Sequence, residues 1–287
     1  MTAKQARFKI GVCQLTVGRE KKENLRKARE MIIQAAAGGA KVAVLPEMFN
    51  CPYQARLFPA YAEEFPGGPS LEMLSETARF LRIYVVGGSI PERAGERVYN
   101  TSFIFGPDGK LLGRHRKVHL FDVDLPGGVR VRESSTLSPG NELTVLNTEL
   151  GPVGVAVCYD IRFPELFRLM ALQGARVIFV PAAFNLTTGP AHWEITFRVR
   201  AVDNQVYVVG ASPARDAGAA YVAYGHSLVV DPWGEVLAAA GEGEEIIYAE
   251  IDPERTGEVR SRLPLLKHRR TDLYQLKLRE SFIGEQG

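Results

Sequence analysis

Three polar side chains interrupt the ends of otherwise apolar segments in this 287-residue chain. Glu47 follows the run "VAVLP", Lys117 follows "LLGRHR", and Cys158 ends "VGVAV". Taken singly, a buried cysteine is most simply a packing residue, and a lysine is most simply solvated or salt-bridged. Taken together, a glutamate, a lysine and a cysteine at the ends of separate predicted strands form a chemically coherent set.

The chemistry that this set offers is acyl transfer to a thiol. A cysteine attacks an acyl carbon as its thiolate, and a free thiol is mostly protonated at neutral pH. Glu47 would accept that proton, because burial raises the pKa of a carboxyl group toward neutrality. Lys117 would lower the thiol pKa and stabilise a tetrahedral oxyanion, with the backbone N–H of Tyr159 as a second donor. Such a site needs no histidine.

Strand and helix patterns alternate along the chain. Residues 8–17 and 41–49 have the β-branched, apolar character of buried strands. Between them, residues 22–39 place their apolar side chains on one helical stripe and end in two glycines. A second helix is predicted from Ser70, which is a suitable N-cap residue.

Turn signals and later strand–helix units complete this plan. Pro-Asp-Gly at 107–109 and Asp-Pro-Trp-Gly at 231–234 each predict a hairpin between two apolar runs. Residues 122–142 form the longest stretch predicted to be irregular, and such a loop is usually functional. Continuous apolar strands indicate sheets that helices cover, so the fold class is α/β in one domain.

Composition excludes several classes of function. The net charge of +2 argues against nucleic-acid binding, and no apolar run is long enough to span a membrane or form a signal peptide. The three cysteines are few and far apart, which predicts a cytoplasmic protein without disulfides. The five histidines lack metal-ligand spacing, and phosphate-loop and dinucleotide motifs are missing, so no metal or cofactor is expected.

At its three polar positions the chain resembles the nitrilase, or carbon–nitrogen hydrolase, superfamily, whose Glu–Lys–Cys triad matches "LPEMF", "RKVHLF" and "VCYDIRFPEL". The resemblance extends from about Arg7 to Tyr274 and is greatest to ω-amidases, through "HLFDVDLPG", "ESSTLSPG", "FNLTTGPAHWE" and "GHSLVVDPWG". It implies a four-layer αββα sandwich in one domain over residues 1–287. It also implies a homodimer or larger homo-oligomer, with the C-terminal tail, about 264–287, at a subunit interface.

The resemblance also implies roles for individual residues. Glu47 would be the general base, Lys117 the stabiliser of the thiolate and the oxyanion, and Cys158 the nucleophile. Glu133 matches a second glutamate of the family and would orient the lysine, the amide or the water. The implied reaction releases ammonia from ω-monoamides of dicarboxylates, such as α-ketoglutaramate, α-ketosuccinamate and succinamate, through a Cys thioester.

A substrate of this kind carries a carboxylate remote from its amide, and a pocket for it needs a cation or several donors. Arg162 is a further candidate, although its motif favours a structural role. The residues that are candidates for contact with the substrate are Tyr53, Arg130, Arg132, Phe184, Thr187 and Thr188.

Two other functions compete with this interpretation. The first is an amidase for deaminated glutathione, or for another small amide, in the same superfamily. The second is a non-catalytic scaffold with the same fold, against which the intact triad argues. Only a small-molecule amide is expected as the partner of the site.

Overall fold

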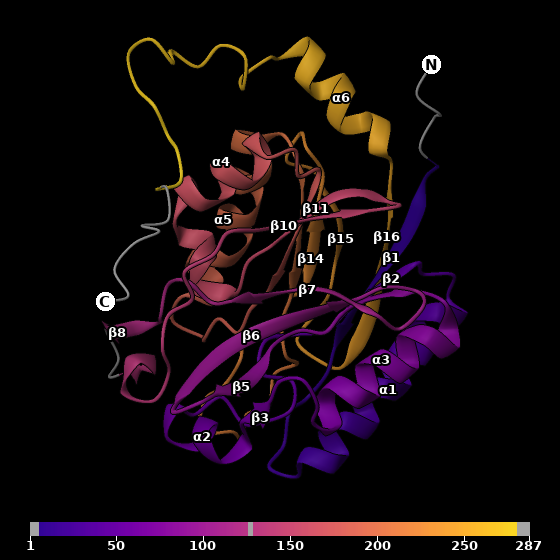
Figure 1. Cartoon of the computed structure of the whole chain (residues 1–287), viewed down its shortest axis with the longest axis vertical. Coiled ribbons are helices and arrows are strands. Elements are labelled where there is room, and N and C mark those ends of the chain that lie inside the picture. The colour runs from indigo at the N-terminus through magenta and orange to yellow at the C-terminus, as the bar shows by residue number, and fades with distance from the viewer. Residues whose placement is uncertain (1–5, 126–128, 280–287) are drawn as a thin grey trace, which may run out of the picture.

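Two β-sheets lie face to face, and helices cover the outer face of each (Figure 1). The computed structural model describes residues 6–125 and 129–279. This arrangement is the four-layer αββα sandwich that the family resemblance implies. The expectation of one domain over residues 1–287 stays a prediction.

The first sheet contains the N-terminal half of the chain and the last strand. Its strands, in spatial order, are β16 (Glu245–Ile251), β1 (Phe8–Gln14), β2 (Val42–Val44), β4 (Tyr84–Val86), β6 (Arg97–Phe105), β5 (Ile90–Ala94) and β3 (Glu63–Glu64). β7 (Leu111–Arg116) pairs with β6. The parallel order β1–β2–β4 requires crossovers, which α1 (Lys21–Ala37) and α3 (Pro69–Leu81) provide.

The second sheet repeats this plan with the C-terminal half. Its strands, in spatial order, are β10 (Thr144–Thr148), β11 (Gly151–Val155), β12 (Val177–Pro181), β13 (Tyr207–Ala211), β14 (Leu228–Val230) and β15 (Val236–Ala239). The parallel strands β11, β12 and β13 are joined through α4 (Pro164–Leu172) and α5 (Gly189–Asn204). Both helices lie on the same side of this sheet (Figure 1).

Three apolar clusters hold the four layers together. One fills the space between the sheets, with Val12 and Val44 of the first sheet packed against Phe179 and Val209 of the second. The other two lie between each sheet and its helices. The central strands are therefore buried on both faces, which explains why the sequence reads as continuous apolar runs.

Both predicted hairpins are confirmed, as β6–β7 and β14–β15. Each turn contains a glycine in the left-handed region, Gly109 at φ +78° and Gly234 at φ +89°. The prediction of Ser70 as an N-cap is wrong, because α3 begins at Pro69, whose fixed φ suits a first helical position. Ser70 instead donates its N–H and hydroxyl to Glu63.

The segment 122–142 is less irregular than predicted. It contains a short hairpin, β8 (Asp122–Leu125) with β9 (Val129–Arg132), followed by the 3₁₀ turn η2 (Glu133–Ser135). Strands of four residues are too short for their alternation to be recognised in sequence. Residues 126–128, between the strands, lie outside the described residues.

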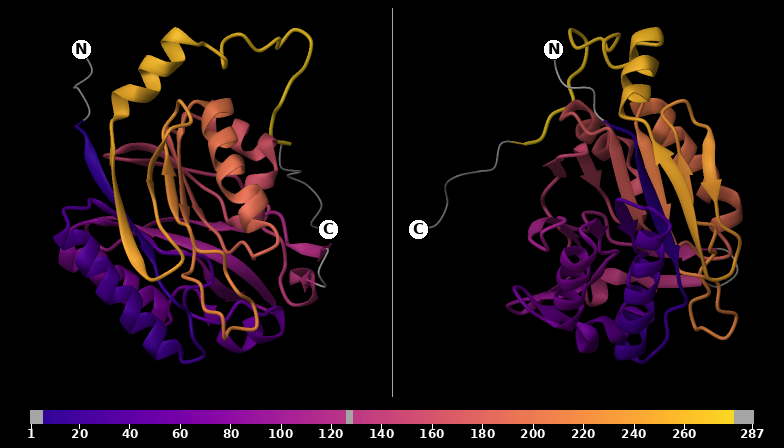
Figure 2. Two further views of the ribbon diagram at one scale, coloured as in Figure 1. Left: turned by 180° about the vertical axis from the view of Figure 1, so that it is seen from behind. Right: turned by 90° about the vertical axis from the view of Figure 1, so that its right-hand side faces the viewer.

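The remaining elements are short or peripheral. They are η1 (Ala55–Leu57), α2 (Phe58–Tyr61), η3 (Cys158–Arg162) and α6 (Pro253–Arg262). After α6 the chain runs outside the sandwich, as the two views in Figure 2 show.

Within the described residues, no helix is long and apolar enough to cross a membrane. In that same part of the chain, no three His, Cys, Asp or Glu side chains form a group that could hold a metal ion.

Candidate active site

Glu47, Lys117 and Cys158 converge between the two sheets. Glu47 follows β2, Lys117 follows β7 directly, and Cys158 begins η3 after β11. Their exposed fractions are 1%, 0% and 4%, so all three polar groups are withdrawn from solvent. Strand ends are where the sites of α/β sheets collect, and here two facing sheets contribute to one site.

Lys117 lies between two carboxylates. Its Nζ is 3.0 Å from Glu47 Oε1 and 2.9 Å from the carboxylate of Glu133. The backbone of Lys117 is also held, because its N–H donates to Asn100 O and its carbonyl accepts from Gly140 N, both at 2.8 Å. Burial alone would lower the pKa of Lys117, but Glu133 and Glu47 raise it well above its usual value. The lysine is therefore a fixed cation.

Glu47 has one oxygen engaged and one free. Oε1 accepts from Lys117 and from Asn100 Nδ2, at 2.8 Å, whereas Oε2 has no hydrogen-bond partner among the described residues. Burial raises the pKa of Glu47, the Lys117 ammonium opposes the rise, and the charge of Glu133 adds to it. A carboxylate with raised proton affinity and a free oxygen is suited to accept a proton.

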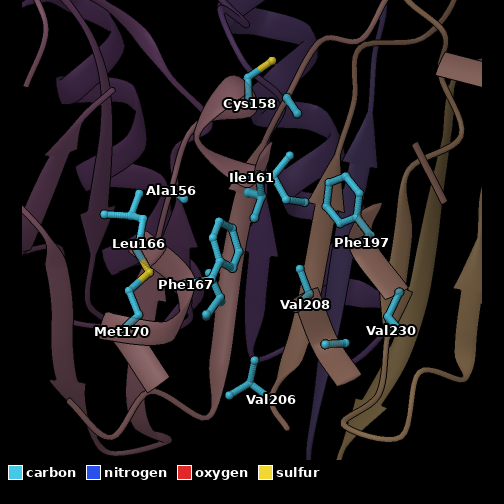
Figure 3. Packing of buried hydrophobic residues seen from close by; sticks show 14 of the residues in the cluster. Ala156, Cys158, Ile161, Leu166, Phe167, Met170, Phe197, Val206, Val208 and Val230 are labelled. Atoms are coloured by element: carbon cyan, nitrogen blue, oxygen red, sulfur yellow. The ribbon is translucent and has the colours of Figure 1, made fainter. Parts of the chain in front are cut away.

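Cys158 sits at a strained turn. Its φ of +46° is in the left-handed region, which a side chain with a Cβ rarely adopts. Figure 3 shows Cys158 at the edge of the apolar cluster, with its sulfur directed away from Ile161 and Phe167. Burial and the charge of Glu47 raise the pKa of the thiol, and Lys117 opposes that rise. The resting thiol is therefore protonated, and it would need a base in order to act as a nucleophile.

Glu133 lies beside the triad and is completely buried. Its Oε1 accepts from the Tyr53 hydroxyl at 2.7 Å, and its Oε2 accepts from Phe121 N at 2.7 Å. The carboxylate is thus held from three directions, the third being Lys117. The structure brings Glu133 and Tyr53 together with the three residues of the predicted triad.

A cavity of about 410 Å³ opens at Glu47. Tyr53 and Tyr221 form part of its wall, with ring centroids 4.5 Å apart. Apart from Glu47, the charged side chains among its described lining residues are Arg19 and Asp216. A hollow of this size accommodates a small organic molecule.

The two loop arginines predicted as candidates lie elsewhere. Arg130 and Arg132 are on β9 and line a separate hollow, formed by the β8–β9 hairpin itself. Arg130 Nε is 2.8 Å from Asp124 Oδ2, in a pair that is largely exposed. The hairpin register, which opposes Asp124 to Arg130, explains this pairing. Neither arginine is among the described residues that line the cavity at Glu47.

The candidates after β12 are also not among the described lining residues. Thr188 is buried, and its N–H and hydroxyl both donate to Asn185 Oδ1 at the start of α5. Thr187 is exposed, with its N–H donating to the same oxygen. Phe184 packs edge-on against Trp193. These residues shape the entry into α5.

The guanidinium of Arg162 packs against two aromatic rings. Its guanidinium lies 4.9 Å from the ring centroid of Phe184 and 6.0 Å from that of Tyr159. Its Nη1 is 3.2 Å from His192 Nδ1. Within the described residues no acidic side chain pairs with Arg162, so a structural role for it would act through these aromatic and histidine contacts.

Sequence reasoning did not identify Asn100, Arg19 or Tyr221. Asn100 is a polar residue in the buried strand β6, which is a signal that could have been used. Arg19 follows β1 and precedes α1, at the kind of strand end where sites collect. Nothing local marks Tyr221, which reaches the cavity only through the path of the loop after β13.

Known proteins are similar to this chain in sequence and in fold. The carbon-nitrogen hydrolase family matches residues 9–261. The chain is 54% identical to a curated ω-amidase NIT2 of Danio rerio, over 94% of this chain and 98% of that protein. It is 52% identical to a chloroplastic ω-amidase of Arabidopsis thaliana, over 94% of this chain and 74% of that protein.

A solved structure supports the same relationship. Saccharomyces cerevisiae Nit3, described as a member of branch 10 of the nitrilase superfamily, superposes with a TM-score of 0.86 at 46% identity. The superposition covers 94% of this chain and 99% of that one. Three findings support the same family. The fold is a four-layer sandwich with Glu, Lys and Cys buried together, the family match covers most of the chain, and the relatives are similar over nearly its full length. The chain belongs to the carbon–nitrogen hydrolase family and is an amide-hydrolysing enzyme.

Proposed function

We propose that this enzyme is an ω-amidase, which releases ammonia from the terminal amide of a small dicarboxylate monoamide such as α-ketoglutaramate. The observation that carries the proposal is the buried cluster of Glu47, Lys117 and Glu133 beside the Cys158 thiol, of which Glu47 lines a small cavity. The ω-amidase names of relatives at 50–54% identity support this substrate class.

In the first half of the reaction, Glu47 accepts the thiol proton while the sulfur of Cys158 attacks the amide carbon. The carbonyl oxygen becomes an oxyanion, which the Lys117 ammonium and the Tyr159 N–H stabilise. The C–N bond then breaks, Glu47 returns the proton to the departing nitrogen, and ammonia leaves. The product on the enzyme is a thioester.

In the second half, water hydrolyses the thioester. Glu47 takes a proton from the attacking water, and the same two donors stabilise the second oxyanion. Collapse of this intermediate breaks the C–S bond and returns the proton to sulfur. Glu133 stays paired with Lys117 during both halves of the reaction. The ammonium therefore keeps its position while Glu47 gains and loses a proton.

The remote carboxylate of the substrate requires a cation in or near the cavity. Arg19 is the positively charged side chain among the described lining residues. Its backbone carbonyl accepts from the Tyr61 hydroxyl, and within the described part of the chain its guanidinium has no hydrogen-bond or ion-pair partner. A free guanidinium matches a planar carboxylate. We therefore place the carboxylate at Arg19 and the amide at Cys158.

The test is ammonia release from a panel of amides. The panel contains α-ketoglutaramate, succinamate, deaminated glutathione and neutral butyramide, with Cys158→Ala as the blank. The proposal expects the largest kcat/KM on the two dicarboxylate monoamides. A larger kcat/KM on deaminated glutathione would overturn the ω-amidase assignment, and release by Cys158→Ala equal to that of the wild type would overturn the thioester route.

A further inference from the structure

A second buried carboxylate lies close to the nucleophile. Asp160 is two residues after Cys158, is completely buried, and does not contact Glu47, Lys117 or Glu133 by any hydrogen bond in the described structure. A buried charge of this kind is costly unless several donors surround it. The donors that surround Asp160 therefore indicate what it does.

The donors to Asp160 come from the residue before the cysteine and from both sides of the lysine. Asp160 Oδ2 accepts from Val157 N at 3.0 Å and is 3.1 Å from His115 Nε2. Asp160 Oδ1 accepts from His119 N at 2.9 Å and is 2.8 Å from His119 Nδ1. Val157 immediately precedes the nucleophile, whereas His115 and His119 flank Lys117 at two residues on either side.

Further contacts fix the side chains of both histidines that face Asp160. His115 Nδ1 is 3.0 Å from Thr144 Oγ1, which places His115 between β10 and η3. The ring of His119 stacks on Phe163, with centroids 3.6 Å apart and planes 8° apart. Because an ionised carboxylate only accepts hydrogen bonds, the ring nitrogens that face Asp160 carry their protons. Hydrogen bonds from His115 and His119 keep the pKa of Asp160 below its usual value despite its burial.

These contacts join two segments that approach each other only through tertiary structure. Cys158 follows the second sheet, and Lys117 follows the first. The φ of +46° at Cys158 is a strained conformation, and such strain persists only where the surroundings fix it. The bond from Val157 N to Asp160 closes the turn around the cysteine, and the bonds to His119 fasten that turn to the lysine segment.

We propose that Asp160 is a positioning residue that sets the separation between the sulfur of Cys158 and the ammonium of Lys117. It acts through the backbone of Val157 and His119 and touches neither the substrate nor the reacting atoms. The inference rests on the proposed thioester chemistry, in which Lys117 stabilises charge on sulfur and on the oxyanion.

The test compares Asp160→Asn with a matched control, Asp231→Asn. Asp231 is also buried, accepts from Trp233 N and Glu235 N, and pairs with Arg255, but it lies in the β14–β15 turn. The measurements are kcat and KM for the amide, the rate of Cys158 alkylation by iodoacetamide, and the melting temperature. The wild-type assay tests the proposed function by itself, so the two failures are distinguishable.

For Asp160→Asn we expect kcat to fall by about 10²-fold, as for a displacement of about 1 Å at a reacting centre, with KM changed by less than about threefold. Alkylation of Cys158 should slow in parallel. Asp231→Asn should lose thermal stability and keep its kcat. A wild-type kcat and alkylation rate in Asp160→Asn would overturn the inference, as would an equal loss of kcat in Asp231→Asn.

If Asp160→Asn does not fold, a second pair of variants tests whether Asp160 acts as a positioning residue. His115→Gln keeps an N–H donor near the position of Nε2, whereas His115→Ala removes it. The inference expects kcat to fall at least about tenfold in His115→Ala and to recover most of that loss in His115→Gln. Equal kcat values in the two variants would overturn it.

Discussion

The ammonium of Lys117 and the carboxylate of Glu133 are 2.9 Å apart and both completely buried. Because Glu133 already neutralises Lys117, the charge of Glu47 is left without a full counterion. This uncompensated charge, together with burial, explains why the pKa of Glu47 is raised. A single ion pair thus gives the neighbouring carboxylate the raised proton affinity that the proposed base requires.

The first prediction concerns Glu133→Gln. Removal of this negative charge lowers the pKa of Glu47, so Glu47 becomes a weaker base and kcat should fall by roughly 10²-fold. The acid limb of the kcat/KM profile should move to lower pH, because Glu47 must be deprotonated in the free enzyme. Tyr53→Phe, which removes one donor and no charge, should leave the acid limb in place. An unshifted acid limb in Glu133→Gln would contradict the proposed role.

The second prediction concerns Glu47→Gln and stability. The folded-state pKa of Glu47 is raised, so this group stabilises the fold fully below its unfolded pKa of about 4.3 and ceases to do so as pH rises through the folded pKa. Glu47→Gln should therefore become more stable relative to the wild type as pH rises, while losing turnover. Urea unfolding at about pH 5 and pH 8 measures this difference.

Glu92→Gln is the matched control for that experiment. Burial alone would raise the pKa of Glu92, but hydrogen bonds from Arg116 and Thr101 lower it. Its contribution to stability is fully present above its unfolded pKa of about 4.3 and is lost only below it, so the effect of Glu92→Gln should stay nearly constant between about pH 5 and pH 8. Parallel trends in the two variants would refute the assignment for Glu47.

The third prediction concerns the three free thiols. Burial raises the pKa of Cys13 to about 12 and also raises that of Cys51, and the charges of Glu63 and Glu47 add to the rise at Cys51. Iodoacetamide should therefore modify Cys158 first in the native protein and the other two only after unfolding. Glu47→Gln should slow the modification of Cys158. Peptide mapping by mass spectrometry measures the order, and early modification of Cys13 would be inconsistent with it.

The fourth prediction concerns recognition of the substrate carboxylate. Arg19→Ala should raise KM for succinamate by about ten- to a hundredfold, the value of a hydrogen bond to a charged group, and leave KM for neutral butyramide unchanged. Asp216→Asn, at the other charged position of the cavity, should not raise KM for succinamate. If Arg162→Ala raises that KM and Arg19→Ala does not, the carboxylate lies over Phe184 instead.

The fifth prediction concerns assembly. The outer face of α5 and the β14–β15 turn expose Ile195 at 62% and Trp233 at 57%, beside Val199 and Val202 around a shallow hollow. We propose that a second copy of the chain covers this face, because exposed apolar patches of this kind mark interaction sites. Ile195→Glu and Trp233→Glu should shift the sedimentation of the protein toward the monomer.

Phe80→Glu is the control for assembly. Phe80 is 78% exposed on α3, in the helical layer that covers the other sheet. This variant should sediment like the wild type, and a monomeric wild type would exclude the proposal.

The predicted role of the tail, 264–287, at a subunit interface is also untested. Its residues 264–279 follow α6 outside the sandwich (Figure 2), and Leu273 is 75% exposed. Residues 280–287 lie outside the described part of the chain.

The apolar pattern of the sequence is enough to predict sheets that helices cover and to single out Glu47, Lys117 and Cys158, whereas the four-layer arrangement is what the family resemblance implies. Apolar runs such as 42–45 reveal buried strands, because a strand covered on both faces excludes polar side chains. The sequence also singles out Glu47, Lys117 and Cys158, because a polar residue at the end of an apolar run is unusual. This information is local and can be read from neighbouring letters.

The tertiary structure decided which other residues join them and how their protons are held. Tyr53 and Glu133 are 80 residues apart, and His119 and Asp160 are 41 apart, yet each pair shares a hydrogen bond. Arg130 has the chemistry of a carboxylate-binding residue, but the hairpin register directs it to Asp124. Proton affinities in the site depend on burial and on the distances between charges, and both exist only once the two sheets have packed together.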